Sequence, residues 1–442
     1  MKHDLIIVGG GPGGLMAAKT AAEDGLKVLL VERKRELTRI NRACLQIFYL
    51  KWMQPDGYIE PVKIELSPDK TRLHLPIPGC YVDYSGPLKP YCNAIWISRS
   101  GYRVYPFKNE LFGFFYDKEY LLANLLASAQ KAGAEVITEA MALGAENTAD
   151  GVKISVRTKS GEQTLKARRA IAADGVNSRI VDSLGLNQKR KVFVFTPKAQ
   201  GVNYVMEGVE PTIPGHETAW LSVNIPSITG HMTGIGLMPG DTRWVSRNYQ
   251  DLMKIPEYAP WFRHARVVKK TAFVATVRTP IREPVAGNVM IISDAAAPIE
   301  TWIQGAIACG YQAVKAILKE LNGQKGYPEY IAWWQKAFFF NDPRYFKGVV
   351  THRALNRICS DEEVDYIYKL FQDKRVVPTL AIAKNPELIK DERPELYQKI
   401  KTNLDGMLKK LEPLLATYPP DSTIFKEPDA HLEPWHSYPS LY

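Results

Sequence analysis

A glycine-rich loop between two short apolar segments limits the fold of this chain more than any other feature. Residues 5–8 (LIIV) and 28–31 (VLLV) are wholly apolar, and runs of this length are typical of parallel strands buried on both faces. Between them, residues 9–14 (GGGPGG) lead into residues 15–22, which are rich in alanine and favour a helix. A strand, a glycine loop, a helix and a second strand within about 30 residues predict a Rossmann-type βαβ unit.

The loop matches the pattern Gly-x-Gly-x-x-Gly, and each glycine of the pattern has a separate role in binding a dinucleotide. Gly9 allows the turn out of the strand, Gly11 lets a pyrophosphate approach the backbone, and Gly14 lets the helix pack closely on the sheet. The N-terminus of the following helix offers N–H groups to the phosphates. Glu32 ends the second strand, where its carboxylate can accept hydrogen bonds from the ribose of an adenosine. These residues predict a dinucleotide site without separating FAD from NAD.

Two further apolar segments end in an aspartate. Residues 170–173 (AIAA) end at Asp174, and residues 289–292 (VMII) end at Ser293 and Asp294. An acidic residue at a strand end can bind a ribityl hydroxyl of a flavin nucleotide, and it can equally cap the helix that follows. On the residues alone, both interpretations stay open for each aspartate.

The order of these motifs resembles that of the glutathione-reductase-type flavoproteins of the aromatic hydroxylase and geranylgeranyl reductase superfamily. The resemblance spans roughly residues 1–345 and implies that FAD, rather than NAD, is the cofactor. Three segments look like the geranylgeranyl reductase branch in particular: Arg42-Ala43-Cys44; residues 116–121 (YDKEYL) with residues 132–136 (AGAEV); and residues 360–364 (SDEEV).

The resemblance also implies a set of site residues. It places Cys44 beside the flavin, where the thiol packs against the ring or influences protonation; the alternative is a small buried side chain. Gly305 opens a segment, residues 305–321, that we expect to be helical, so that its first N–H groups face a pyrophosphate or a flavin carbonyl. The eight histidines show no metal-ligand spacing, and no metal is expected. The predicted cofactor-binding residues are Gly9, Gly11, Gly13, Gly14, Glu32, Arg33, Arg42, Cys44, Lys118, Ala142, Asp174, Asp294, Gly305, Ala306 and Ile307, with Cys44 also the candidate catalytic residue.

The chain departs from the family pattern at three places. Ser293 stands where the family has a glycine before the aspartate, and residues 304–307 (QGAI) stand where it has GGGI. The family's Tyr-x-Trp-x-Phe-Pro strand, which shapes its isoprenoid pocket, would fall at residues 234–239 (GIGLMP), where the tyrosine and tryptophan are absent. We therefore expect a substrate that differs from the family's long polyprenyl chains.

The predicted strands of the nucleotide-binding sheet come from the start, the middle and the third quarter of the chain, so the domain that holds them must be discontinuous. Alternating patterns at residues 191–196 and 233–237 predict a separate, mainly antiparallel sheet. We expect an α/β protein with three parts: an FAD-binding domain of residues 1–75, 105–188 and 276–345; an inserted substrate domain of residues 76–104 and 189–275; and a C-terminal helical region of residues 346–442.

Charge and cysteine content bear on partners and location. The formal net charge of +10 suits anionic partners such as a phosphorylated cofactor, an acidic electron carrier or an anionic membrane face, and no nucleic acid is expected. The five cysteines form no CxxC pair, which favours a reducing, cytoplasmic environment. No apolar window is long enough to span a bilayer. Residues 338–340 (FFF) either pack in the core or make a peripheral membrane contact.

Together these features predict an FAD-dependent oxidoreductase that transfers hydride between flavin N5 and an unsaturated, alkene- or enoyl-type organic substrate. No second Gly-x-Gly-x-x-Gly motif is present, so electrons would come from transient contact with NAD(P)H, from ferredoxin, or from another carrier. Two alternatives stay open. One is a flavin-dependent aromatic monooxygenase, and the other is an electron-transfer flavoprotein without a small organic substrate.

Overall fold

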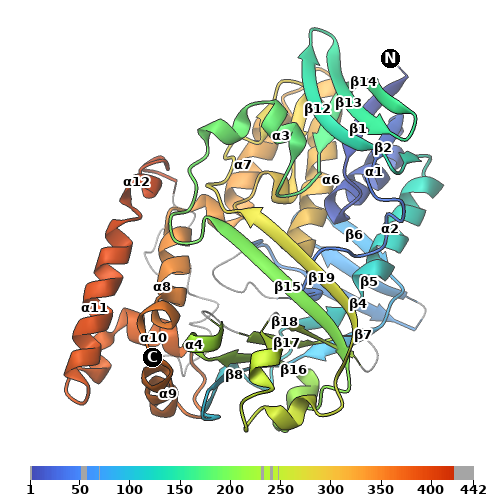
Figure 1. Ribbon diagram of the computed structural model, residues 1–442. Coiled ribbons are helices and arrows are strands. Elements are labelled where there is room, and N and C mark those ends of the chain that lie inside the picture. The colour runs from blue at the N-terminus through green and yellow to red at the C-terminus, as the bar shows by residue number, and fades with distance from the viewer. Residues whose placement is uncertain are drawn as a thin grey trace.

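The computed structural model describes residues 2–50, 57–68, 70–229, 233–238, 242–246 and 248–422. It divides into a nucleotide-binding half at the top of Figure 1, a large mixed sheet at the bottom, and C-terminal helices along the left side. Within the described ranges, no helix has the length and hydropathy of a membrane-spanning segment.

The nucleotide-binding half is built on parallel strands in the order β11-β2-β1-β14-β21. The N-terminal part of β14 continues beyond the parallel sheet and pairs antiparallel with β13, which pairs with β12. This order places the four predicted apolar segments side by side, so their C-terminal ends meet at one edge. The bounds are β1 (His3–Val8), β2 (Val28–Val31), β11 (Glu135–Ile137), β12 (Met141–Thr148), β13 (Gly151–Thr158), β14 (Gly161–Ala172), β20 (Val285–Ala286) and β21 (Val289–Ile291).

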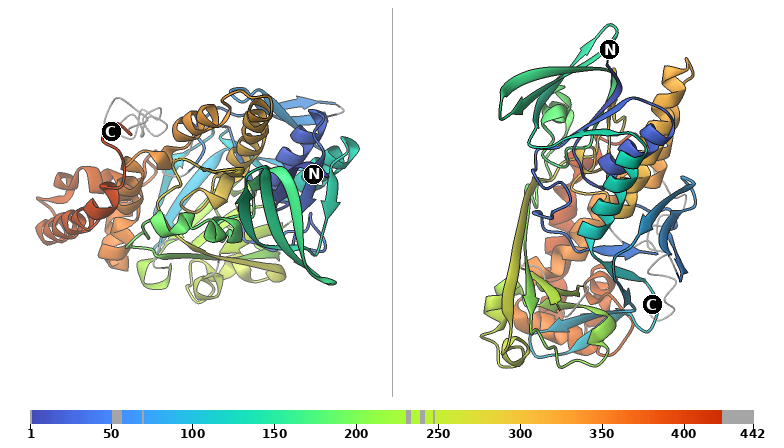
Figure 2. Two further views of the ribbon diagram at one scale, coloured as in Figure 1. Left: turned by 90° about the horizontal axis from the view of Figure 1, so that it is seen from above. Right: turned by 90° about the vertical axis from the view of Figure 1, so that its right-hand side faces the viewer.

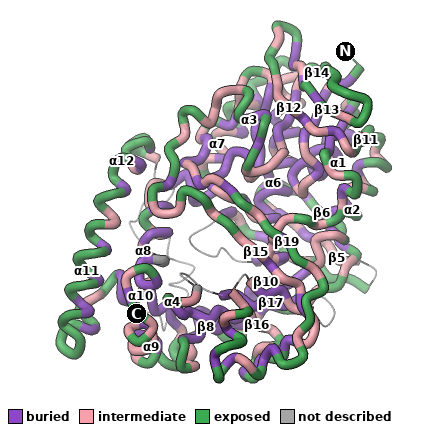
Figure 3. The backbone as a smooth tube through the Cα atoms, in the orientation of Figure 1, coloured by how far each residue is buried: buried purple, intermediate pink, exposed green. Residues whose placement is uncertain are grey.

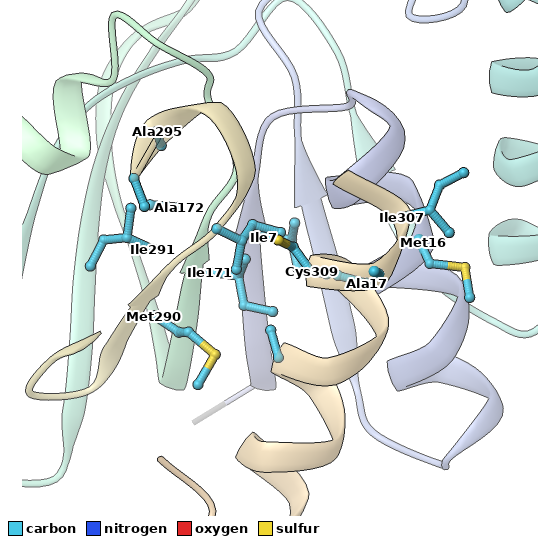
Figure 4. Close-up of a cluster of buried hydrophobic side chains, with 14 of the residues drawn as sticks. Ile7, Met16, Ala17, Ile171, Ala172, Met290, Ile291, Ala295, Ile307 and Cys309 are labelled. Atoms are coloured by element: carbon cyan, nitrogen blue, oxygen red, sulfur yellow. The ribbon is translucent and has the colours of Figure 1, made fainter. Parts of the chain in front are cut away.

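Three helices cover one face of this parallel sheet: α1 (Pro12–Glu23), α2 (Lys118–Lys131) and α6 (Trp302–Leu321), as Figure 2 shows in its right-hand view. Helices α1 and α6 approach so closely that a Cβ atom on Gly310 would lie 2.2 Å from the Gly13 carbonyl oxygen. Between them and the strands lies a core of small and branched side chains, drawn in Figure 4. This packing fixes the start of α6 against the glycine loop.

The second large sheet has the strand order β19-β15-β18-β17-β16-β8-β9 and is antiparallel except where β16 runs alongside β8. It confirms the predicted, mainly antiparallel insertion. The expected strand at residues 191–196 is wrong, because that segment makes only one bridge, from Val192 to Arg278, before β15 begins. The bounds are β8 (Asn93–Ser98), β9 (Arg103–Phe107), β15 (Lys198–Glu207), β16 (Ala219–Asn224), β17 (Thr233–Leu237), β18 (Thr242–Ser246) and β19 (Arg266–Thr276).

Two small sheets adjoin these halves. The sheet β3-β10-β7 carries an aromatic cluster against the large sheet, and the β4-β5-β6 meander packs on α2. Strand β6 falls inside residues 76–104, which the sequence assigned to the substrate domain. Its buried side chains, Cys80, Val82 and Tyr84, nevertheless join the core of the nucleotide-binding half. The bounds are β3 (Ile47–Tyr49), β4 (Lys63–Ser67), β5 (Lys70–Leu75), β6 (Cys80–Tyr84), β7 (Leu88–Tyr91) and β10 (Gly113–Tyr116).

The C-terminal helices are tied to the large sheet by buried polar contacts. The Asn224 side chain, at the end of β16, donates to Asn356 Oδ1 at 2.8 Å and to the Tyr368 hydroxyl at 3.1 Å. The aromatic stretch at residues 338–340 is buried in the core, so it presents no membrane-facing patch. The remaining helices are α3 (Arg179–Ser183), α4 (Pro226–Thr229), α5 (Tyr249–Leu252), α7 (Tyr327–Ala337), α8 (Arg344–Ile358), α9 (Asp361–Leu370), α10 (Pro378–Lys384), α11 (Pro394–Lys409) and α12 (Glu412–Leu415). In Figure 3, exposed residues run along much of α11, whereas buried residues gather around α6 and α7.

Candidate functional site

A deep cleft opens at the C-terminal ends of the parallel strands, the edge where open α/β sheets bind ligands. It encloses about 1680 Å³ of empty space, including its open mouth. Most of the predicted cofactor residues line it: Gly9, Gly11, Gly13, Gly14, Glu32, Arg33, Arg42, Cys44, Lys118, Ala142, Asp174, Asp294 and Ala306. Gly305 and Ile307 do not.

The glycine loop has the geometry that a pyrophosphate requires. Gly9 has φ +106°, and a Cβ there would lie 2.3 Å from the Ala173 carbonyl oxygen. A Cβ on Gly14 would lie 1.9 Å from the Gly9 oxygen, whereas a Cβ on Gly11 would meet no atom within 4 Å. Helix α1 has no side-chain cap and no acidic residue in its first turn. Its N–H groups and positive dipole end are therefore free for an anion at the open side of Gly11.

Glu32 is held rigidly at the end of β2. Its buried carboxylate accepts the Gly10 N–H at 2.7 Å and the Lys34 N–H at 2.8 Å, one on each oxygen. A carboxylate has about four lone-pair positions, so these two bonds orient the group and leave acceptor positions for ribose hydroxyls. The residue thus fits the adenosine end of FAD.

Asp174, at the end of β14, caps the helix that follows, as one of the two interpretations of its position predicted, and it also lines the cleft. It accepts the Ser178 hydroxyl at 2.5 Å and the Arg179 N–H at 2.9 Å, which caps the start of α3. Burial raises the pKa of Asp174 above its usual value, and these hydrogen bonds oppose that rise. The carboxylate is therefore committed mainly to the protein.

Asp294, which follows β21, binds both the protein backbone and a cleft arginine. Its Oδ1 accepts the Thr301 N–H at 2.9 Å, just before α6, and its Oδ2 lies 2.7 Å from Arg42 Nη1. Burial is the largest single influence and lowers the pKa of the Arg42 guanidinium, but Asp294 and Glu300 together outweigh it, so the net pKa lies above the usual value. This pair connects residues 33–46 to the start of α6, and both of its members line the cleft.

Ser293 shows why a glycine is usual before this aspartate. Its backbone has φ +57°, in the left-handed region that L-residues rarely adopt. The serine keeps this conformation because the turn from β21 into the cleft requires it. The departure from the family pattern is thus tolerated at the expense of local strain.

Cys44 lies where the two halves of the molecule meet. The Lys118 ammonium is 3.9 Å from its sulfur, and the Asn203 side chain on β15 donates to its carbonyl at 3.4 Å. Gln46 accepts the Lys118 N–H at 2.8 Å, which fixes the start of α2 beside this loop. A thiol and an ammonium group therefore face the cleft together.

Gly305 and Ile307 are excluded from the cleft because α6 begins at Trp302 rather than at Gly305. A Cβ on Gly305 would lie 2.7 Å from the Phe338 ring, and Ile307 is buried in the core between α1 and α6 (Figure 4). Sequence reasoning missed Trp302 itself, which lines the cleft with Tyr49. The signal was Thr301, a good helix N-cap residue directly before it.

The glycines of β17 are compensated by indoles on the neighbouring strands. A Cβ on Gly236 would lie 2.4 Å from Trp244 Nε1, and a Cβ on Gly234 would lie 2.9 Å from the Trp220 ring. The two indoles meet edge to face with ring centroids 4.8 Å apart. Aromatic side chains are thus present on this sheet although the family's Tyr-x-Trp strand is not; Pro239, the last residue of that segment, lies outside the described residues.

Comparison with known proteins agrees with this geometry. The protein-family model described as FAD dependent oxidoreductase matches residues 4–37, and the family model described as FAD binding domain matches residues 114–256. Digeranylgeranylglycerophospholipid reductase of Methanocaldococcus jannaschii is 24% identical over 416 residues, which is 88% of this chain and 97% of that protein. Its counterpart named reductase 1 in Methanothermobacter thermautotrophicus is 25% identical, over 92% of this chain and 94% of the relative.

A solved structure has the same fold. The geranylgeranyl bacteriochlorophyll reductase-like protein of Thermoplasma acidophilum superimposes with a TM-score of 0.63 at 18% identity, covering 93% of this chain and 99% of the other. The parallel sheet, the glycine loop and Glu32 define the class: the protein is an FAD-dependent oxidoreductase with a glutathione-reductase-type fold. Within that class, the chain is similar over most of its length to proteins named as digeranylgeranylglycerophospholipid reductases.

Proposed function

We propose that the protein is a reductase that saturates a carbon–carbon double bond in an isoprenoid-type substrate. The observation that carries the proposal is the position of Cys44 and Lys118, a thiol and an ammonium group that border the FAD cleft where it meets the large sheet. Saturation of an alkene needs a hydride and a proton. FAD, when bound and reduced, supplies the hydride.

The remaining tasks belong to the chain. The glycine loop and the N-terminus of α1 hold the pyrophosphate, Glu32 holds the adenosine ribose, and Asp294 with Arg42 holds the ribityl chain. Cys44 delivers the proton to the second alkene carbon, and the neighbouring Lys118 ammonium restores it. The names of the relatives support an isoprenoid substrate, and the Tyr49 and Trp302 rings that line the cleft supply an apolar, aromatic surface for it.

The electron donor and the domain boundaries belong to the same proposal. We infer that reducing equivalents arrive from outside the chain, from NAD(P)H in transient contact or from an acidic carrier such as ferredoxin that is attracted by the basic surface.

We propose the same three-part domain division as the sequence predicts, except that β6 belongs to the FAD-binding part, because its side chains pack in that core. A small organic substrate then enters between the two sheets.

An anaerobic experiment tests the function. The full chain is loaded with FAD, reduced with dithionite, and mixed with geranyl, farnesyl or geranylgeranyl diphosphate or the corresponding glycerol ethers. We expect the flavin to be reoxidised and the product to gain two hydrogens, with Cys44→Ser slower by about 100-fold and Cys92→Ser, outside the cleft, unchanged. Reoxidation that occurs only with oxygen and yields a hydroxylated product would instead establish a monooxygenase. No reoxidation with any alkene would contradict the proposal.

A further inference from the structure

Trp302 is the largest side chain among the described residues that line the cleft, and two features of the backbone are arranged around it. Its own φ is +58°, a left-handed conformation that is a genuine outlier for a bulky residue. Gly57, opposite it, has φ +100°, and a Cβ there would lie 2.9 Å from the indole Cδ2. A helix that began in the usual way would have no positive φ at its first residue. A residue with a side chain at position 57 would occupy the space in which the Trp302 ring packs.

The indole is also held from the side. It packs against the Tyr49 ring with centroids 4.6 Å apart, and through Tyr49 it joins the aromatic cluster of β3, β10 and β7. Residues held in sparsely populated backbone conformations cluster at ligand-binding sites, because the surrounding structure must over-determine them. Core packing alone gives no reason for this strain, since the Trp302 side chain is only partly buried and borders the cleft.

The position of Trp302 along the cleft follows from the strand order. Glu32 ends β2 and Asp294 follows β21, and β1 and β14 lie between these two strands. The cleft therefore runs across the strand ends from the adenosine site at Glu32 to the start of α6. Trp302 lines the cleft at that second end, as do Asp294 and Arg42, and in the proposed function the reactive end of FAD and the substrate would meet there.

We propose that Trp302 is a specificity-determining residue whose indole forms the end wall of the substrate chamber and limits the length of the isoprenoid chain that reaches the flavin. This inference rests on the proposed alkene reductase function. The chamber then accepts a short isoprenoid and hinders a long one, because a long chain must extend through the space that the ring occupies. Removal of the ring opens that space without touching the FAD-binding residues.

The test compares variants across a chain-length series. For wild type we expect a higher kcat/KM with geranyl than with geranylgeranyl diphosphate. In Trp302→Leu the ratio shifts toward geranylgeranyl by about tenfold or more, and in Trp302→Phe by less, because discrimination by apolar volume is of this size. Trp333→Leu is the matched control: its indole packs on Phe338 away from the cleft, and the ratio should stay at the wild-type value.

A binding measurement tests the chain-length preference separately from the reduction of the alkene. Fully saturated analogues of the same lengths are titrated into the FAD-loaded wild type and variants by calorimetry, with FAD content and thermal unfolding checked for each protein. Trp302→Leu should bind the long analogue more tightly than wild type relative to the short one, even if no alkene is ever reduced. An unchanged length preference in Trp302→Leu, or no binding of any analogue to any variant, overturns the assignment of Trp302. Binding of the analogues without reduction of any alkene overturns the proposed reaction instead.

Discussion

Gly14 of the nucleotide loop and Gly236 of β17 both lack room for a side chain, but for different reasons. A Cβ on Gly14 would collide with a backbone oxygen at 1.9 Å, whereas a Cβ on Gly236 would collide with the Trp244 indole at 2.4 Å. A backbone atom cannot move without breaking the strand–helix turn, while an indole can be exchanged for a smaller ring. Gly14 is therefore required by the path of the backbone. Gly236 and Trp244 share one space, so a larger residue at position 236 can be compensated by a smaller ring at position 244.

The largest effect should come from Gly14→Ala. The new methyl group forces α1 away from the Gly9 turn, and we expect the free energy of unfolding to fall by about 3 kcal/mol or more. Gly11→Ala is the control, because its methyl group meets no protein atom: the stability of the FAD-free protein should change by less than about 0.5 kcal/mol, while FAD affinity falls. Thermal unfolding and FAD titration measure both quantities. Equal destabilisation by the two variants would break the comparison.

The next effect concerns Gly236→Ala, which we expect to cost about 1–2 kcal/mol through overpacking against Trp244. Trp244→Phe shortens the ring and removes Nε1, which has no hydrogen-bond partner among the described residues. The double variant should therefore be more stable than the sum of the single changes by at least about 0.5 kcal/mol. Chemical denaturation of the four proteins provides the cycle. Simple additivity would show that the glycine and the indole do not share one space.

A smaller effect should come from Glu119, which ties α2 to β19 between the two regions. It accepts Lys269 Nζ at 2.7 Å and the Ile40 N–H at 2.9 Å. Burial raises the pKa of Glu119, but these hydrogen bonds and the charges of Lys269 and Arg39 together lower it by more, so the net pKa lies below its usual value of 4.5. A lowered folded pKa stabilises the protein above pH 4.5, and this stabilisation is lost as the pH falls through the folded value.

Glu119→Gln should therefore cost at most about 1 kcal/mol at pH 7, because the pair is partly exposed. The difference from wild type should shrink as the pH falls below 4.5. Thermal unfolding from pH 7 to pH 3 measures it, and Lys269→Gln should reproduce the loss at pH 7 without adding to it in the double variant. A stability gap that widens in acid would contradict the assignment.

The smallest effect should come from Ser293→Gly. The left-handed backbone at φ +57° is strained for serine and relaxed for glycine, while the greater freedom of glycine in the unfolded chain offsets part of the gain. We expect a net stabilisation of about 0.5 kcal/mol, seen as a higher unfolding temperature. Ser293→Ala keeps the Cβ and should give no gain. If alanine stabilised as well as glycine, the effect would belong to the hydroxyl group and not to the backbone.

Much of the glycine-loop region follows from local sequence patterns. These patterns dictate the strand–loop–helix turn, and the structure has Gly9, Gly11, Gly14 and Glu32 at the positions in that turn that their spacing predicts. The strand ends at Asp174 and Asp294 were also predicted, because apolar runs that end in an acidic residue are visible in the chain. What these carboxylates bind was left open, since Ser178 and Arg42 become their partners only in three dimensions.

The end of the cleft near α6 differs from the sequence-based expectation. Helix α6 begins at Trp302 rather than at Gly305, with a left-handed backbone at Trp302, so Trp302 lines the cleft and Gly305 and Ile307 do not. The loss of the Tyr-x-Trp strand suggested an altered pocket, but Trp220 and Trp244 restore aromatic volume from neighbouring strands. Side chains of neighbouring strands pack together on one face of a sheet, and which of them meet depends on the register of strand pairing. That register cannot be deduced from the sequence of a single strand.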